Sequence, residues 1–235
     1  MKYKAILFDL DGTLLDTLGD LSAAVNYALA FFSLPLLSDE AVRQRIGNGE
    51  KTLISRCVPP GTPMETETRV LEIFREYYRQ NTDLTTRPYP GVDRLLAALS
   101  EKKIPMAVVT NKDEISAQKL VERFFPGVFG AVCGTGTGTE VRGQRSEARG
   151  REILDLTSIP YKPDPALPLK ALGALDVSAS DALLIGDSVT DLQTAENCGC
   201  GFLCVGWGYG GYKALEEQGV GVVCDVDEII KRSII

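Results

Sequence analysis

The feature that most constrains the fold of this chain is an apolar run that ends in two closely spaced carboxylates. Residues 3–8 are typical of a buried strand, and Asp9 and Asp11 follow at once. Side chains two residues apart in an extended segment point to the same side, so the two acids are expected to lie together. Paired carboxylates raise each other's pKa unless a cation neutralises them, and such oxygen ligands suit Mg²⁺. Gly12 then permits a tight turn whose backbone N–H groups can face an anion. The segment predicts a metal and phosphate site at a strand end; the alternative is an exposed acidic turn.

Strands and helices are expected to alternate along most of the remaining chain. Apolar runs predict further strands over residues 104–109, 128–133, 182–185, 202–205 and 221–224. Apolar residues at helical spacing predict helices over residues 92–99, 115–124, 165–175, 189–199 and 226–230. This alternation predicts an α/β fold with a Rossmann-like, doubly wound parallel sheet. Ligands of such sheets bind beyond the carboxyl ends of the strands.

Residues 16–87 contain only helical patterns, with expected helices over residues 18–32, 38–46, 53–57 and 64–78. Residues 62–65 also match a capping box in which Pro63 is the first helical residue. We therefore expect an all-helical cap domain over residues 16–87, inserted into a core domain of residues 1–15 and 88–235.

Residues 134–160 are expected to form a flexible insertion within the core. The segment begins with alternating glycine and threonine and continues with many charged residues. Long loops inside compact domains are usually functional or disordered. Two interpretations follow, a mobile surface insertion or a lid near the active site.

Composition excludes several classes of function. The chain has no histidine, so Ser-His and Cys-His triads are excluded and proton transfer falls to carboxylates, lysine or tyrosine. A net charge of −7 without a basic stripe argues against nucleic acid as a partner. No apolar run reaches transmembrane length and the start lacks a signal-peptide layout, so we expect a cytoplasmic protein without membrane contact. The six cysteines are expected to be reduced structural thiols rather than metal ligands.

Three further segments carry polar residues at the expected strand ends. Thr110, Asn111 and Lys112 follow the second strand, and Lys162 precedes a helix. Asp187 ends the fourth strand, and Asp191 lies one helical turn later on the same face. Each segment alone has an ordinary interpretation as a turn or a solvated charge. Together and in this order with Asp9 and Asp11, they resemble the four motifs of the haloacid dehalogenase superfamily, most of whose members are Mg²⁺-dependent phosphatases.

The resemblance implies a role for each matched residue. Asp9 would be the nucleophile that forms an aspartyl-phosphate, and Asp11 the general acid and then the general base. Thr110 would hydrogen-bond the phosphoryl oxygens, and Lys162 would neutralise charge on Asp9 and the phosphoryl group. The implied metal ligands of Mg²⁺ are Asp9, Asp11 through its backbone carbonyl, Asp187 and, through water or by supporting Lys162, Asp191. The implied substrate-binding residues are Gly12, Thr13, Asn48, Asn111 and Lys112.

Two segments suggest the substrate. Residues 45–49, which include Asn48, and residues 206–210 resemble stretches of the phosphoglycolate phosphatases. A helix break is an almost equally good interpretation of the first. The leading hypothesis is a phosphatase of a small phosphorylated metabolite, 2-phosphoglycolate above others, acting as a monomer or homodimer. Alternatives are a pyrophosphatase, a sugar-phosphate phosphatase or mutase, and a non-catalytic phosphate-binding protein.

Overall fold

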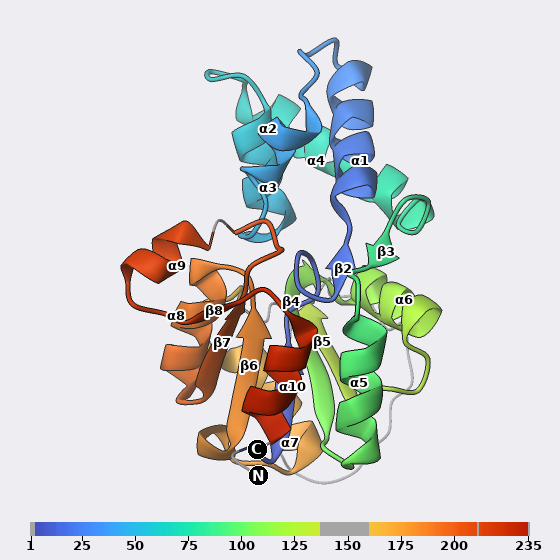
Figure 1. Ribbon diagram of the computed structural model, residues 1–235. Coiled ribbons are helices and arrows are strands. Elements are labelled where there is room, and N and C mark those ends of the chain that lie inside the picture. Colours follow the sequence, from blue (N-terminus) through green and yellow to red (C-terminus); the bar gives the residue numbers. More distant parts are fainter. Residues whose placement is uncertain (1–2, 137–159, 211, 235) are drawn as a thin grey trace, which may run out of the picture.

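Six parallel strands form the central sheet in a computed structural model that describes residues 3–136, 160–210 and 212–234 (Figure 1). Their spatial order is β5–β4–β1–β6–β7–β8. The bounds are β1 Ala5–Phe8, β4 Met106–Asp113, β5 Ala131–Thr135, β6 Ala182–Gly186, β7 Gly201–Val205 and β8 Val222–Val223. Because later strands extend the sheet outward from β1 in both directions, the order is that of a doubly wound sheet. The predicted fold class is confirmed.

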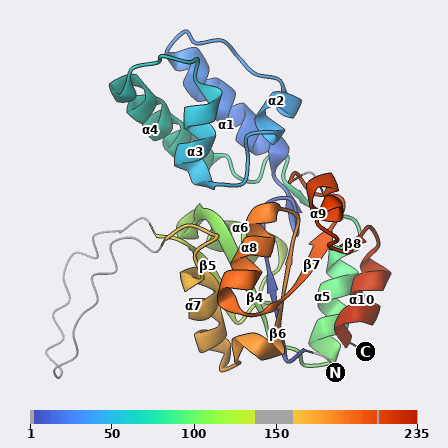
Figure 2. The same ribbon diagram turned by 90° about the vertical axis from the view of Figure 1, so that its left-hand side faces the viewer.

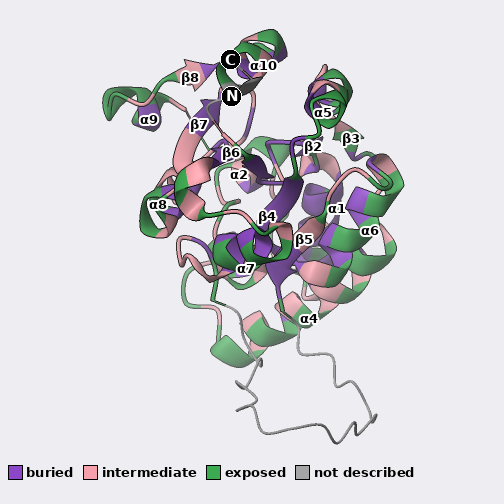
Figure 3. Ribbon diagram, turned by 90° about the horizontal axis from the view of Figure 1, so that it is seen from below, coloured by how far each residue is buried: buried purple, intermediate pink, exposed green. Residues whose placement is uncertain are grey.

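The alternating side chains of the strands divide the core into two clusters, one on each face of the sheet. Ile6 and Phe8 of β1 pack with helices α5 (Val92–Glu101), α6 (Glu114–Phe124) and α10 (Val226–Ile234). Ala5 and Leu7 pack on the other face with α7 (Ala166–Leu175) and α8 (Val189–Cys198). Figure 3 shows buried strands between helices whose outer faces are exposed. Burial on both faces explains why the strands are continuous apolar runs.

Four helices build a separate hydrophobic cluster beyond the carboxyl ends of the strands (Figures 1 and 2). They are α1 (Leu18–Phe31), α2 (Asp39–Arg43), α3 (Gly49–Cys57) and α4 (Met64–Gln80). Helix α4 buries Val70, Phe74 and Tyr78, which are four residues apart and therefore share one face. The predicted helices of this segment are all present, with shorter bounds for the second.

A small antiparallel ribbon connects these helices to the sheet. Strand β2 (Leu15–Asp16) pairs with β3 (Arg87–Pro88) where the chain leaves and re-enters the core. Beside it, the buried Asp20 carboxylate accepts hydrogen bonds from the backbone N–H and hydroxyl groups of Thr85 and Thr86 at 2.7–3.0 Å. Besides the β2–β3 pairing, Asp20 of α1 therefore links the start of the helical segment to the residues that return to the sheet.

Two local predictions are wrong. Pro63 is the N-cap of α4 rather than its first residue, so Glu65 comes one position too early for a capping box, and the Thr62 hydroxyl donates to the Pro59 carbonyl instead. Strand β4 continues past Val109 to Asp113, with a register shift against β5 between these residues. Such a bulge re-aims side chains near a strand end.

The remaining elements are α9 (Lys213–Glu217) and a 3₁₀ turn at Ala179–Asp181. Most of the predicted insertion of residues 134–160 lies outside the described residues, since the description stops at residue 136 and resumes at residue 160. Among the described residues, none of the helices combines the length and apolar character needed to cross a bilayer.

Candidate active site

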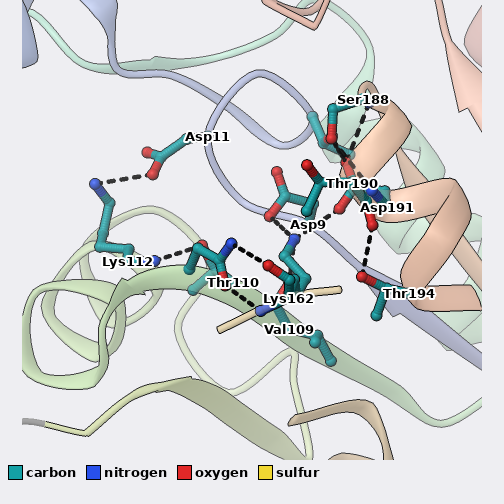
Figure 4. Close-up of polar contacts among 12 residues, drawn as sticks. Asp9, Asp11, Val109, Thr110, Lys112, Lys162, Ser188, Thr190, Asp191 and Thr194 are labelled. Atoms are coloured by element: carbon teal, nitrogen blue, oxygen red, sulfur yellow. Dashed lines mark hydrogen bonds and ion pairs between the residues drawn. The ribbon is translucent and has the colours of Figure 1, made fainter. Parts of the chain in front are cut away.

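Asp9 and Lys162 form the centre of a buried ionic cluster at the carboxyl end of β1 (Figure 4). The Asp9 backbone N–H continues the sheet by donating to the Ile185 carbonyl at 2.9 Å. The Lys162 ammonium donates to the Asp9 and Asp191 carboxylates, both at 2.6 Å, and to the Val109 carbonyl at 3.1 Å. Burial alone would lower the pKa of Lys162, but Asp191 and Asp9 raise it above its ordinary value. Lys162 therefore remains a cation.

Asp187, which follows β6, is fixed by a loop from the far end of the chain. Its Oδ2 accepts from the backbone N–H groups of Tyr209 at 2.6 Å and Gly210 at 2.9 Å. Its Oδ1 accepts from the Thr13 hydroxyl at 3.3 Å. A Cβ at Gly12, whose φ is +90°, would lie 2.7 Å from Asp187 Oδ2. Only glycine leaves room for this carboxylate.

The acids of this cluster fit a divalent cation. One carboxylate oxygen from each of Asp9, Asp187 and Asp191 lies within 4.8 Å of the other two. Burial, with repulsion from Asp191 and Asp187, raises the pKa of Asp9 well above its ordinary value despite Lys162. Burial and the Asp191 charge raise the pKa of Asp187 to about 6. The single ammonium of Lys162 pairs with Asp9 and Asp191 but not with Asp187, so the negative charge of the three acids is only partly neutralised. Hard oxygen donors of this kind suit a divalent metal.

Both oxygens of Asp191 already have partners. Oδ1 accepts from Lys162, while Oδ2 accepts from the Ser188 backbone N–H at 3.1 Å and hydroxyl at 2.6 Å. The bond from the Ser188 N–H to Asp191 and the reciprocal bond from the Asp191 backbone N–H to the Ser188 hydroxyl, at 3.3 Å, form the capping box that starts α8. Asp191 therefore positions Lys162 directly.

Asp11 lies apart from the acid cluster, which corrects the expectation that it points with Asp9. Its Oδ2 is 2.9 Å from the Lys112 ammonium (Figure 4). Its Oδ1 accepts from the Thr17 hydroxyl at 2.7 Å. The strand rule fails because β1 ends at Phe8, so the turn that follows no longer alternates. Nucleophile and general-acid candidates thus sit in separate ion pairs around one cavity.

The other predicted site residues divide into two groups. Thr110, Asn111 and Lys112 line the cavity, and Asn111 accepts from the Lys162 backbone N–H at 2.6 Å while donating to the Gly47 carbonyl at 3.3 Å. Asn48 is not a lining residue; its amide donates to the Thr190 hydroxyl at 3.4 Å. The glycines on either side of Asn48, Gly47 and Gly49, do line the cavity.

The cavity has a volume of about 80 Å³ and lies between the sheet and helices α1–α4. Its helical side is mostly apolar, with Leu21, Ile46, Leu53 and Phe74. It also includes three polar residues that the sequence did not single out for the site: Glu50, Tyr78 and, on the side of the sheet, Ser188. The Glu50 carboxylate is 2.6 Å from the Arg75 guanidinium. The spacing of α4 predicts that Tyr78 faces inward, but does not show what its hydroxyl contacts.

Tyr209 joins the acid cluster to the start of α1. Besides its backbone bond to Asp187, its hydroxyl accepts from the backbone N–H groups of Thr17 at 2.6 Å and Leu18 at 2.9 Å. It donates to Asp16 at 2.8 Å. One side chain therefore supplies the capping that the Thr17 hydroxyl, bonded to Asp11, does not.

Comparisons with known proteins agree with this geometry. The family model for haloacid dehalogenase-like hydrolases matches residues 3–199. A phosphoglycolate phosphatase of Pectobacterium atrosepticum is 34% identical over 227 residues, covering 94% of this chain and 88% of the relative. One from Pseudomonas savastanoi pv. phaseolicola is 32% identical, covering 94% of this chain and 76% of the relative. A crystal structure from Lactobacillus delbrueckii subsp. bulgaricus, provisionally assigned as a phosphoglycolate phosphatase, superposes with a TM-score of 0.86 at 29% identity, covering 99% of each chain.

Proposed function

This chain belongs to the haloacid dehalogenase-like hydrolases, and from that premise we propose that it is a Mg²⁺-dependent phosphatase of a small phosphomonoester. The observation that carries the proposal is the Asp9 carboxylate. It accepts a hydrogen bond from the Lys162 ammonium at 2.6 Å, and one of its oxygens lies within 4.8 Å of carboxylate oxygens of Asp187 and Asp191. Asp9 also lines a cavity that Asp11 lines as well. A nucleophilic carboxylate, countercharge and an acid are the groups that phosphoryl transfer through a covalent intermediate requires.

The reaction divides into two transfers. In the first, a carboxylate oxygen of Asp9 bonds to phosphorus, the ester P–O bond breaks, and Asp11 gives its proton to the departing alkoxide. In the second, Asp11 takes a proton from a water molecule, whose oxygen bonds to phosphorus and releases Asp9 and phosphate. Lys162 neutralises the phosphoryl oxygens throughout, and Thr110 orients them by hydrogen bonding.

Mg²⁺ would be held by Asp9, Asp187 and the Asp11 backbone carbonyl, while Asp191 keeps Lys162 in place. When bound, it supplies the countercharge that three acids and a phosphate dianion otherwise lack. Gly12 and Thr13 shape the turn that brings these groups together, through the close approach to Asp187.

Helices α1–α4 act, in this proposal, as a cap domain over residues 16–87 that closes on the core of residues 1–15 and 88–235. Residues of that cap would mainly determine which substrate binds, since the core contacts the phosphoryl group. The best candidate is 2-phosphoglycolate, because the curated relatives at 32–34% identity carry that activity in their names.

A phosphate-release screen tests the proposal. The purified protein with Mg²⁺ is offered a panel of phosphorylated metabolites that includes 2-phosphoglycolate, sugar monophosphates and pyrophosphate. We expect the highest kcat/KM with 2-phosphoglycolate. Pyrophosphate as the best substrate, or isomerisation of a sugar phosphate without phosphate release, would favour another reaction on the same scaffold, and no turnover of any compound would reject the proposal.

A further inference from the structure

Two ammonium groups line the cavity among the described residues, and they have different neighbours. Lys162 lies between Asp9 and Asp191, where it balances the nucleophile. Lys112 lies beside Asp11 (Figure 4). Its ammonium also contacts the Tyr78 hydroxyl of helix α4 in the cap. A substrate with a second negative group would therefore meet a second cation, which pairs with the general-acid candidate rather than with the nucleophile.

Lys112 retains hydrogen-bonding capacity. Its side chain is only 3% exposed, and its ammonium, which has three N–H donors, bonds Asp11 at 2.9 Å and the Tyr78 hydroxyl at 2.9 Å. No third acceptor is present among the described residues. The Tyr78 hydroxyl accepts from Lys112, so its own hydrogen is available, and it also has no acceptor in the described part of the chain. Buried donors of this kind are normally paired.

We propose that Lys112 and Tyr78 form a subsite for a carboxylate of the substrate, a role that rests on the phosphatase function proposed above. The subsite would combine one ammonium N–H of Lys112 from strand β4 with the hydroxyl of Tyr78 from helix α4, which lie 2.9 Å apart and both belong to residues that line the cavity. Charge-assisted hydrogen bonds are the stronger ones, which makes this pair suitable for recognition.

The position of Asp11 limits the length of the substrate. Asp11 must reach the ester oxygen in order to protonate it, and the same carboxyl is 2.9 Å from Lys112. The second anionic group must then lie within a few bonds of the ester oxygen, as the carboxylate of a 2-phospho acid does.

The remaining cap surface favours the same class of substrate. Leu21, Ile46, Leu53 and Phe74 offer no partners to the hydroxyl groups of a sugar, whose burial without hydrogen bonds is unfavourable. The nearby Glu50 carboxylate is already paired with Arg75 at 2.6 Å. The cavity thus combines one carboxylate subsite with apolar walls.

The test compares 2-phosphoglycolate with 2-hydroxyethyl phosphate, in which a neutral CH₂OH group replaces the carboxylate. The readout is the ratio of their kcat/KM values. We expect Lys112→Gln to lower this ratio about 10- to 100-fold, as loss of a hydrogen bond between charged groups does. Tyr78→Phe should lower it several-fold. The matched control is Lys170→Gln, because Lys170 pairs with Glu114 at 2.8 Å on the surface, and its ratio should equal that of the wild type.

Each possible outcome either supports or overturns the proposed carboxylate subsite. A wild type that hydrolyses both compounds equally, or a Lys112→Gln variant that keeps the wild-type ratio, overturns the subsite while leaving the phosphatase function intact. If Lys112→Gln hydrolyses neither compound, Tyr78→Phe decides, with a lowered ratio supporting the subsite and an unchanged ratio overturning it. Turnover of other phosphomonoesters but neither of these also overturns it, whereas no turnover of any phosphomonoester rejects the proposed function itself.

Discussion

Replacing Lys162 by methionine tests whether the buried cluster is organised around one cation. The lysine side chain is 3% exposed, and the Asp9 and Asp191 side chains that share it are 10% and 1% exposed. Methionine keeps the aliphatic volume but leaves two carboxylates without their partner. Removing one member of a buried ion pair costs about 3–5 kcal/mol of unfolding free energy.

The assay is urea unfolding of both proteins in EDTA, with Lys4→Met as the matched control. Lys4 forms a bridge of similar length, 2.8 Å to Asp181, but its side chain is 72% exposed. That exposed pair should contribute about 0–1 kcal/mol, because water and salt screen it. EDTA is needed since Mg²⁺ at 100 times its Kd would stabilise either protein by about 2.7 kcal/mol.

The pH dependence of the Lys162→Met penalty follows from the carboxylates. The pKa of Asp9 is already raised by burial and by Asp191 and Asp187, and loss of the lysine raises it further. The folded variant then binds more protons than the unfolded chain, so its stability rises as the pH falls toward the ordinary range of aspartate. A penalty below about 1 kcal/mol at pH 8, or one that grows as the pH falls, would refute this reasoning.

Three further predictions concern neighbouring groups. Asp20→Asn replaces one acceptor oxygen by an N–H₂ group facing the Thr86 donors and should cost about 1–3 kcal/mol at pH 7 in urea unfolding. Although burial opposes the shift, hydrogen bonds from Thr86 and Thr85 lower the pKa of Asp20. The extra unfolding free energy of the wild type is therefore present above the ordinary aspartate pKa and should vanish as the pH falls through the lowered pKa. A difference in unfolding free energy that stays constant with pH would contradict this. Tyr209→Phe removes the acceptor of two N–H groups of α1 and should lower the unfolding free energy by about 1–3 kcal/mol, whereas an unchanged urea midpoint would count against that contact. EDTA should abolish phosphate release and Mg²⁺ restore it, and activity that persists after dialysis against EDTA would exclude the proposed metal dependence.

Much of the fold follows from local patterns. The apolar runs that become β1 and β6 are buried on both faces, and the acids that follow them mark the carboxyl edge of the sheet. The same edge carries Thr110 of β4, because parallel strands present their carboxyl ends together, and Lys162 reaches it from the turn before α7. Helix α4 could be predicted from the sequence in the same way, since its buried residues repeat every four positions.

What local patterns did not predict depends on contacts between distant segments. Strands β2 and β3 have two residues each, too few for any periodicity, and exist because the two chain crossings meet. The Tyr209 hydroxyl caps a helix that begins 191 residues earlier. Asp11 turned toward Lys112 because the strand had already ended, and no spacing rule extends through a glycine turn.

The central claim is that the Asp9 carboxylate takes up the phosphoryl group, and phosphate release by Asp9→Asn tests it most directly. The variant keeps the size of the side chain and an oxygen for Lys162, so circular dichroism and the urea midpoint should report a folded protein. We predict that its kcat for the best substrate of the wild type falls on the order of 10⁴-fold or more. A folded Asp9→Asn protein that releases phosphate within tenfold of the wild-type rate would contradict the account.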